Sequence, residues 1–326
     1  MVQRNPLRSH EAILALLTLL LFAGAALFYP QFGTADSVLD SLDDTAILIL
    51  LAIGQMLVIL TRGIDLSVAA NVALTGMCVA LINHAAPGTP MILIVLIAMG
   101  IGAVLGAING ALVWQVGIPP IVVTLGTMAV YRGATYLVSG GKWVTSGDMS
   151  ASFMGLVRDT HLGLSNLSWL MILFLLAAWL FLRYTTAGRS LYVAGNNPAA
   201  SAYIGVSVGQ AQFLAFTLCG MLSGLCGYLW AARFAVAYTE TANGFELTVI
   251  AACVIGGISI AGGIGNVLGL LLGCLFLGVI KNALPIMGIS PFWQTAISGL
   301  VILSAVVINA LQTTTGRQRI LEGSAT

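Results

Sequence analysis

The chain has 326 residues, of which 59% are hydrophobic and only 7% are charged, and its formal net charge is +1. So few charged side chains cannot cover a soluble globule, and so small a net charge excludes a protein that binds nucleic acid through phosphate contacts. A helix of about 20 apolar residues crosses a bilayer, and the chain has apolar residues for about ten such helices. The composition therefore predicts an all-α polytopic membrane protein.

Apolar stretches separated by polar or Gly/Pro-rich joints predict ten spans within a single transmembrane domain, 1–326, and broken helices among them are expected where glycines cluster. The expected spans are 12–29, 45–61, 66–83, 90–115, 119–138, 168–184, 210–237, 246–262, 264–281 and 290–309. The first follows a short basic start without a small-residue cleavage pattern, so we expect it to be retained. With the N-terminus inside, seven Lys or Arg residues lie on the cytoplasmic side and five outside, which favours this orientation.

The joint between the second and third spans, 62–67, predicts a turn at the membrane surface. Asp65 or Ser67 is placed to cap the helix that follows, and Arg62 is expected to pair with Asp65. Further on, small residues recur at four-residue spacing in Gly102, Gly106 and Gly110 and again in Gly265, Gly269 and Gly273. This spacing predicts helices whose backbones approach closely.

Two glycine pairs bracket residues 258–261, where each glycine weakens a helix by about 1 kcal/mol relative to alanine. Broken helices at membrane depth are tolerated where they are buried in protein or line a cavity. The segment is therefore either part of a transport pathway or a tight turn between two spans.

The polar residues within the spans are mostly uncharged. They include Asn71, Asn109, Thr124, Thr127, Tyr131, Gln210, Gln212, Ser223, Asn266 and Gln294. Hydroxyls and amides suit either the passage of a neutral hydroxylated solute or hydrogen bonding between helices. Asn71, Thr124 and Asn266 are the leading candidates for a substrate path. No chain of acidic residues runs through the spans, which disfavours a carrier driven by an ion gradient.

The loop 185–209 between the sixth and seventh spans predicts a short surface helix. Asn197 suits the N-cap, Pro198 the first helical position and Gly205 a left-handed C-terminal position, with Tyr203 and Ile204 just before it. A helix of two turns cannot cross the bilayer, so it is expected on the cytoplasmic surface. It is either a capped connector or a knob that docks into a partner through Tyr203 and Ile204.

No chemistry for energy transduction is visible in the sequence. Gly140-Gly141-Lys142 is followed by Trp143 rather than Ser or Thr, so it is not a phosphate-binding loop, and no catalytic triad stands out. The five cysteines lie in apolar runs and the three histidines are scattered, so neither a metal site nor another cofactor is expected. The chain is expected not to be an enzyme, and ATP would be hydrolysed by a separate chain.

Together the joints resemble the permease family of ABC importers for ribose, rhamnose, other monosaccharides and autoinducer-2. The resemblance covers about residues 45–309, and its matching segments are 61–68, 117–127, 131–133, 188–206, 251–259 and 262–263. One departure is Ala69-Ala70-Asn71, where the family often has a Gly-Ser pair.

The resemblance implies a transmembrane subunit of the bacterial inner membrane that pairs with a second permease chain, a cytoplasmic ATP-binding protein and a periplasmic or extracellular solute-binding protein. The cargo would be a small neutral hydroxylated solute, a monosaccharide or autoinducer-2. By the same resemblance, the residues that couple the chain to the ATPase are Gly188, Arg189, Asn197, Pro198, Tyr203, Ile204 and Gly205. The alternatives are a secondary carrier that works alone and a membrane assembly subunit that transports nothing.

Overall fold

The computed structural model describes residues 10–290 together with 293, 296, 299, 300 and 303. Its α-helices are α1 (His10–Phe28), α2 (Ala35–Leu60), α3 (Val68–Ala85), α4 (Met91–Trp114), α5 (Pro120–Ser139), α6 (Ala151–Arg158), α7 (Asn166–Tyr184), α8 (Thr186–Asn196), α9 (Pro198–Tyr203), α10 (Val208–Phe234), α11 (Phe245–Ile255) and α12 (Val267–Ile286). Two short 3-10 helices, η2 (Pro30–Gly33) and η3 (Ser146–Asp148), lie in the connections. The tenth expected span, 290–309, lies almost wholly outside the described residues.

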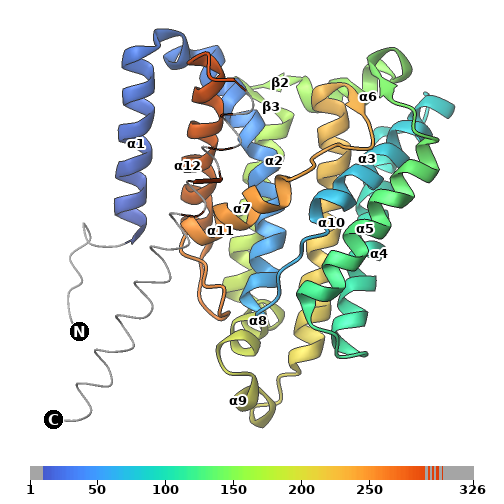
Figure 1. Ribbon diagram of the computed structural model, residues 1–326, viewed down its shortest axis with the longest axis vertical. Helices are drawn as coiled ribbons and strands as arrows, with labels where there is room; N and C mark the ends of the chain where they lie inside the picture. The colour runs from blue at the N-terminus through green and yellow to red at the C-terminus, as the bar shows by residue number, and fades with distance from the viewer. Residues whose placement is uncertain (1–9, 291–292, 294–295, 297–298, 301–302, 304–326) are drawn as a thin grey trace.

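Two small antiparallel strand pairs lie at one end of the helix bundle (Figure 1). The strand β1 (Val144–Thr145) pairs with β4 (Val236–Ala237), and β2 (Thr160–His161) pairs with β3 (Leu164–Ser165). The helices α8 and α9 lie at the opposite end. The predicted topology makes the strand end the outer side and the α8–α9 end the cytoplasmic side.

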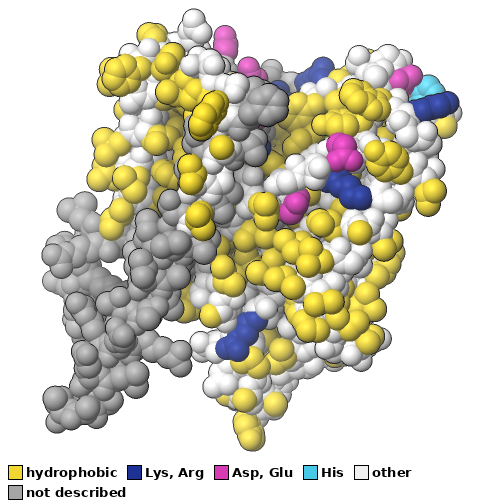
Figure 2. All heavy atoms as spheres, in the orientation of Figure 1, with side chains coloured by type: hydrophobic (Ala, Val, Ile, Leu, Met, Phe, Trp, Pro, Cys, Tyr) yellow, Lys and Arg dark blue, Asp and Glu magenta, His cyan; other side chains and the backbone are white. Residues whose placement is uncertain are grey.

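The expected all-α membrane fold is confirmed. Within the described part of the chain, eight helices are long and apolar enough to cross a membrane: α1, α2, α3, α4, α5, α7, α10 and α12. Hydrophobic side chains cover most of the visible helix surfaces, where lipid would lie (Figure 2). The centre of the bundle is α2, which is buried along nearly all of its length from Thr45 to Leu60.

One very close helix contact joins α4 and α10 through glycines. A Cβ atom added to Gly102 would lie 2.2 Å from the carbonyl oxygen of Gly220, and one added to Gly106 would lie 2.2 Å from that of Phe216. No side chain larger than hydrogen fits at these positions. The glycine spacing seen in the sequence therefore allows the backbones to touch, which suits a membrane, where apolar side chains gain little by leaving lipid. Gly269 and Gly273 bring α12 equally close to α11.

The expected span 246–262 is not one continuous helix. The helix α11 begins at Phe245 and has only 11 residues. Its length of about 16 Å is half of the hydrocarbon thickness. It lies at mid-height in the bundle (Figure 1). The backbone of Gly257, Gly262 and Gly263 has φ between +72° and +84°, a conformation that ends the helix and is unfavourable for other residues. The chain thus returns from the outer side as a loop and a half-helix.

Candidate coupling surface and substrate path

A side chain caps the N-terminus of α8, and another side chain caps the N-terminus of α9. Thr185 ends α7 and also begins α8, because its Oγ1 accepts a hydrogen bond from the Gly188 amide at 2.9 Å. Asn197 caps α9 by accepting a hydrogen bond from the Ala200 amide at 3.0 Å, and Pro198 takes the first helical position. The sequence signals for this short helix are therefore satisfied in the structure.

The far end of α9 presents two apolar side chains to the outside. The buried hydroxyl of Ser201 donates to the carbonyl of Val193 at 3.0 Å, which fastens α9 to α8. Gly205 adopts φ +77°, so the chain turns sharply after the helix. Tyr203 is 92% exposed and Ile204 is 67% exposed, and both lie at the end of the molecule where Figure 1 places α9. An exposed apolar pair on a rigid, capped helix suits docking to another protein.

The start of α8 packs directly on the end of α7. A Cβ atom on Gly188 would lie 2.2 Å from the carbonyl oxygen of Phe181, so only glycine fits. The neighbouring Arg189 is exposed, and its guanidinium donates a long hydrogen bond of 3.4 Å to the Arg183 carbonyl. The seven coupling residues expected from the sequence thus belong to one continuous element. Their contact with an ATPase stays a prediction.

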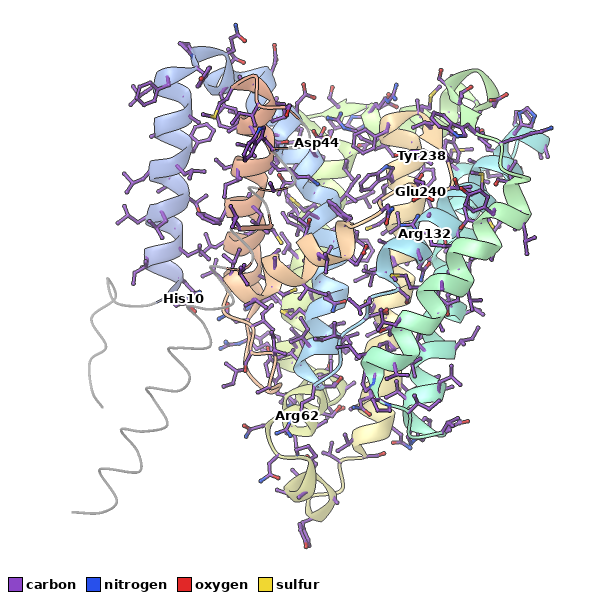
Figure 3. The ribbon with its side chains drawn as sticks, viewed as in Figure 1. His10, Asp44, Arg62, Arg132, Tyr238 and Glu240 are labelled. Carbon is purple, nitrogen blue, oxygen red and sulfur yellow. The ribbon has the colours of Figure 1, made fainter. Side chains whose placement is uncertain are left out.

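Arg62 connects this element to the bundle, a role that the sequence did not reveal. Its Nε donates to the carbonyl of Gly195 at 2.7 Å and its Nη2 to that of Asn196 at 3.0 Å, at the C-terminus of α8 (Figure 3). Free carbonyls at a helix C-terminus attract cations, so the guanidinium is well placed. The expected pair between Arg62 and Asp65 is absent from the ion pairs of the described residues.

Three segments meet at this joint. A Cβ atom on Gly195 would lie 1.8 Å from the carbonyl oxygen of Leu60, the last residue of α2. The same Leu60 carbonyl accepts a hydrogen bond from the Gly263 amide at 3.0 Å. Tyr192 on α8 donates to the Gly265 carbonyl at 3.0 Å, and burial raises the pKa of its hydroxyl. A displacement of α8 must therefore act on both α2 and the 256–266 loop.

Asp65 makes no ion pair with Arg62 among the described residues, but it does bind at the start of the helix that follows, as expected. It is buried, and its Oδ1 accepts hydrogen bonds from the Ser67 amide at 2.8 Å and the Ser67 hydroxyl at 2.6 Å, at the start of α3. The Ser67 hydroxyl in turn accepts a hydrogen bond from Asn109 on α4 at 2.8 Å. With its amide nitrogen facing the Asp65 carbonyl, Gln55 on α2 makes two hydrogen bonds of 3.1 Å to the Asp65 backbone. These polar residues fix the break between α2 and α3.

The three candidate path residues lie at separate places. Asn71 is buried where α3 crosses α4 and α10, and its amide reaches the carbonyls of Gly102 and Gly220 at 3.3 Å. Thr124 is buried on α5 and donates to the Ile64 carbonyl at 3.1 Å. Asn266 caps α12 by accepting from the Gly269 amide at 2.7 Å, and it is exposed. The structure brings no two of them into hydrogen-bond contact, and their part in a path stays a prediction.

Hydrogen bonds from an arginine to backbone carbonyls tie α5 to the loop before α11. Arg132 donates to the carbonyls of Thr239 at 2.9 Å and Thr241 at 2.7 Å, and Figure 3 shows Glu240 and Tyr238 beside it in the outer half. Charged residues within a membrane face protein or water rather than lipid. The guanidinium of Arg132 thus meets protein rather than lipid.

The described residues contain no cluster of His, Cys, Asp or Glu that could hold a metal ion. What they contain is a bundle with a half-helix, an arginine on α5 bound to the loop before that half-helix, and a capped pair of helices fastened to the core at one end. These are features of a transport subunit rather than of a catalytic centre.

Comparison with known proteins agrees with this geometry. Residues 37–306 match the family model described as the permease component of branched-chain amino acid transport systems. The chain belongs to this permease family. It is 38% identical to the autoinducer 2 import system permease protein LsrC of Enterobacter sp. (strain 638), over 99% of this chain and 92% of that protein.

A second relative is named for a different cargo. The ribose import permease protein RbsC of Escherichia coli (strain K12) is 35% identical, over 93% of this chain and 94% of that protein. No solved structure matches the chain. The family membership and the apolar helices make the chain a multi-pass membrane permease component and not itself an enzyme.

Proposed function

We propose that the chain is the transmembrane subunit of an ATP-driven importer in the bacterial cytoplasmic membrane. Its cargo is a small neutral hydroxylated solute, a monosaccharide such as ribose or the signal molecule autoinducer-2. Its partners are a second permease chain, a cytoplasmic ATP-binding protein that hydrolyses ATP and an external solute-binding protein. The two relatives are named for the import of autoinducer 2 and of ribose, and these names support the cargo class.

The joint at Arg62 is the observation that carries this proposal. A partner that moved α9 would move α8 with it, because the hydrogen bond from Ser201 to the Val193 carbonyl holds the two helices together. The bonds from Arg62 would then pass that movement to the end of α2 and the break before α3. A rigid connection from α9 to the end of α2 serves transport only if a separate protein moves α9.

The proposal is tested by reconstitution. The chain is purified together with a candidate ATP-binding protein and a candidate solute-binding protein from the same organism and placed in vesicles, and uptake of labelled D-ribose and of autoinducer-2 is followed with and without ATP. We expect uptake that requires ATP and both partners. Uptake by the chain alone, driven by a proton or sodium gradient, would instead identify a secondary carrier. Absence of uptake of any hydroxylated solute by the full assembly would leave only an assembly role.

A further inference from the structure

A cavity of about 290 Å³ lies in the outer half of the bundle, between α2, α10, α11 and α12. It is remote from the coupling surface, at the side that the topology makes external. Its walls are of two kinds. Aromatic side chains line one part of it, and charged or amide side chains line another.

The aromatic part consists of Trp230 and Phe234 from α10 and Phe245 from α11. The centroid of the Trp230 ring lies 5.2 Å from that of Phe234 and 5.2 Å from that of Phe245, the latter pair meeting edge to face at 82°. Such mutual packing holds the rings in fixed orientations. The cavity therefore offers preformed aromatic surface to a ligand that has an apolar face.

The polar part consists of Asp44 from α2 and of Lys281 and Asn282 from α12. Both hydrogen bonds that Asp44 receives go to Oδ1, at 3.3 and 3.4 Å, so Oδ2 has no donor among the described residues. The Asn282 amide nitrogen donates to the Ser41 carbonyl at 3.3 Å, and within the described residues its oxygen accepts nothing. Lys281 Nζ lies 4.3 Å from the centroid of the Phe245 ring. Within the described residues, the lining therefore combines two oxygen atoms that can accept a hydrogen bond with the ammonium group of Lys281, which can donate one.

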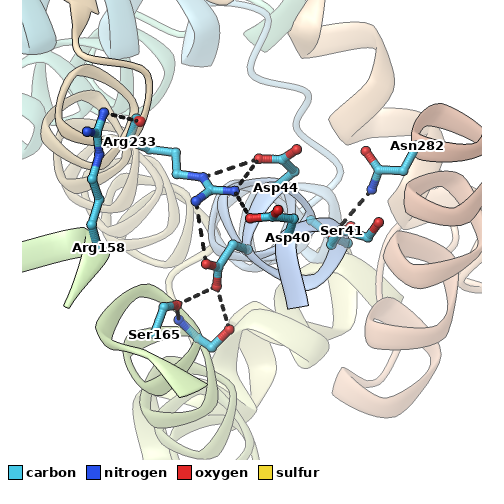
Figure 4. A network of polar contacts seen from close by, with 10 residues as sticks. Asp40, Ser41, Asp44, Arg158, Ser165, Arg233 and Asn282 are labelled. Atoms are coloured by element: carbon cyan, nitrogen blue, oxygen red, sulfur yellow. Dashed lines mark hydrogen bonds and ion pairs between the residues drawn. The ribbon is translucent and has the colours of Figure 1, made fainter. Parts of the chain in front are cut away.

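Arg233 fixes the position of the acidic wall. Its guanidinium bridges Asp40 at 3.2 Å, Asp43 at 3.7 Å and Asp44 at 3.3 Å, all on α2 (Figure 4). Because the carboxylate of Asp44 is held through one oxygen, the other is oriented before any ligand arrives. Arg158 adds a hydrogen bond of 2.8 Å to the Arg233 carbonyl and steadies the same end of α10.

We infer that this cavity is an outer binding site for one ring of a small neutral polyhydroxylated solute. The aliphatic C–H groups on one face of a sugar ring are apolar and pack on aromatic rings, while each hydroxyl both donates and accepts a hydrogen bond. The two walls match these two properties. This inference rests on the proposed function and adds to it a place where the cargo is held.

Size and charge set the ligand class. A volume of about 290 Å³ is at the lower limit for small-molecule sites, which measure about 300–1,000 Å³, so it suits a single sugar ring rather than two. The formal charges of Asp44 and Lys281 are opposite and cancel. A ligand with a net charge would therefore meet one attractive and one repulsive group, whereas a neutral ligand loses nothing.

The test is protection from thiol labelling. Of the five native cysteines, only Cys78 is not fully buried, so Cys78→Ser gives a background with little reactivity toward a water-soluble thiosulfonate reagent. Asn282→Cys then reports on the cavity, and Tyr203→Cys, exposed on α9, is the matched control. The complete importer in lipid nanodiscs is labelled with and without D-ribose or autoinducer-2, whichever the unaltered assembly takes up.

At a concentration ten times the dissociation constant, the solute should slow labelling of Asn282→Cys about tenfold and leave Tyr203→Cys unchanged. Equal labelling of Asn282→Cys with and without solute, or no labelling at all, overturns the site while transport by the unaltered importer still stands. If the unaltered importer takes up no hydroxylated solute, the proposed function fails, and this inference fails with it.

A second measurement separates ligand contact from packing. Trp230→Ala should raise the KM for uptake about tenfold, and Trp230→Phe should restore most of the affinity. The control is Trp179→Ala on α7, an exposed aromatic residue outside the cavity. An unchanged KM in Trp230→Ala contradicts the proposal.

Discussion

The Nε of Arg62 lies 2.7 Å from the carbonyl oxygen of Gly195, a residue 133 positions further along the chain. This hydrogen bond joins the end of α2, the most deeply buried helix, to the end of α8, which lies at the surface. The backbone of Arg62 is itself in the left-handed region, at φ +65°. The geometry of the turn thus aims a cation at a helix C-terminus.

We predict that Arg62→Asn uncouples ATP hydrolysis from transport. Asparagine tolerates the left-handed backbone but is too short to reach α8, and the two lost hydrogen bonds to a charged group are worth about 1.5–3 kcal/mol each in general. ATP-dependent uptake should fall at least about tenfold, while the ATPase still co-purifies. Lys142→Asn, an exposed residue at the outer end, serves as the control. Uptake at the normal rate in Arg62→Asn would show that the movement of α8 reaches the bundle through contacts other than Arg62.

Gly195→Ala is predicted to destabilise the protein. The added methyl group would lie 1.8 Å from the Leu60 carbonyl oxygen, so α8 would have to move away from α2. Overpacking of this kind costs about 1–3 kcal/mol or more. The melting temperature in detergent measures the effect. Gly126→Ala on α5, where nothing lies within 4 Å of the new Cβ, should leave the melting temperature unchanged or raise it.

Tyr203→Asp combined with Ile204→Asp is predicted to abolish uptake and weaken ATPase binding. Both side chains are exposed, so the bundle itself does not need them, and expression and pairing of the permease chains should persist. Charges placed in an apolar contact must be desolvated without a partner. The measurement is the stoichiometry of the ATPase in the purified complex. A double variant that transports normally would identify α9 as an ordinary connector.

Cysteines at positions 71, 124 and 266 are predicted to differ in reactivity. Position 266 is exposed in the described conformation and should react at once with a water-soluble reagent, whereas positions 71 and 124 are buried. If Asn71 and Thr124 face a path that opens during the cycle, their substitutes react in only one nucleotide state. Protection of both in every state would mean that they serve only helix packing.

Local signals in the sequence predicted the short helix α9, because its cap Asn197, its first residue Pro198 and the terminal Gly205 all lie within or next to the helix itself. The four-residue glycine spacing likewise predicted close helix contacts. The roles of Arg62 and Asp65 could not be predicted in this way. Their partners lie on α8, α4 and α2, and nothing in the nearby sequence shows which distant carbonyl a guanidinium will meet.

The glycine pairs predicted a weakened helix after residue 255, but they did not predict that α11 would be only a half-helix. Residues 246–262 are apolar enough for a span, and hydropathy alone does not register the break after Ile255. The glycines that follow were ambiguous between a turn and a pathway, and only their positive φ angles and the contact with Leu60 decide where the chain bends. The cavity near Trp230 brings α2 together with α10, α11 and α12 from the far half of the chain, so it could not be predicted either.

The glycine contact between α4 and α10 limits how the molecule can change shape. Two helices whose backbones interlock at Gly102 and Gly220 cannot slide or tilt against each other without colliding, so they travel as one solid block. Any change between inward-open and outward-open forms must then occur at other helix seams of the bundle. Substitutions that stiffen those seams should trap the permease in a single state, which would make that state accessible to structure determination.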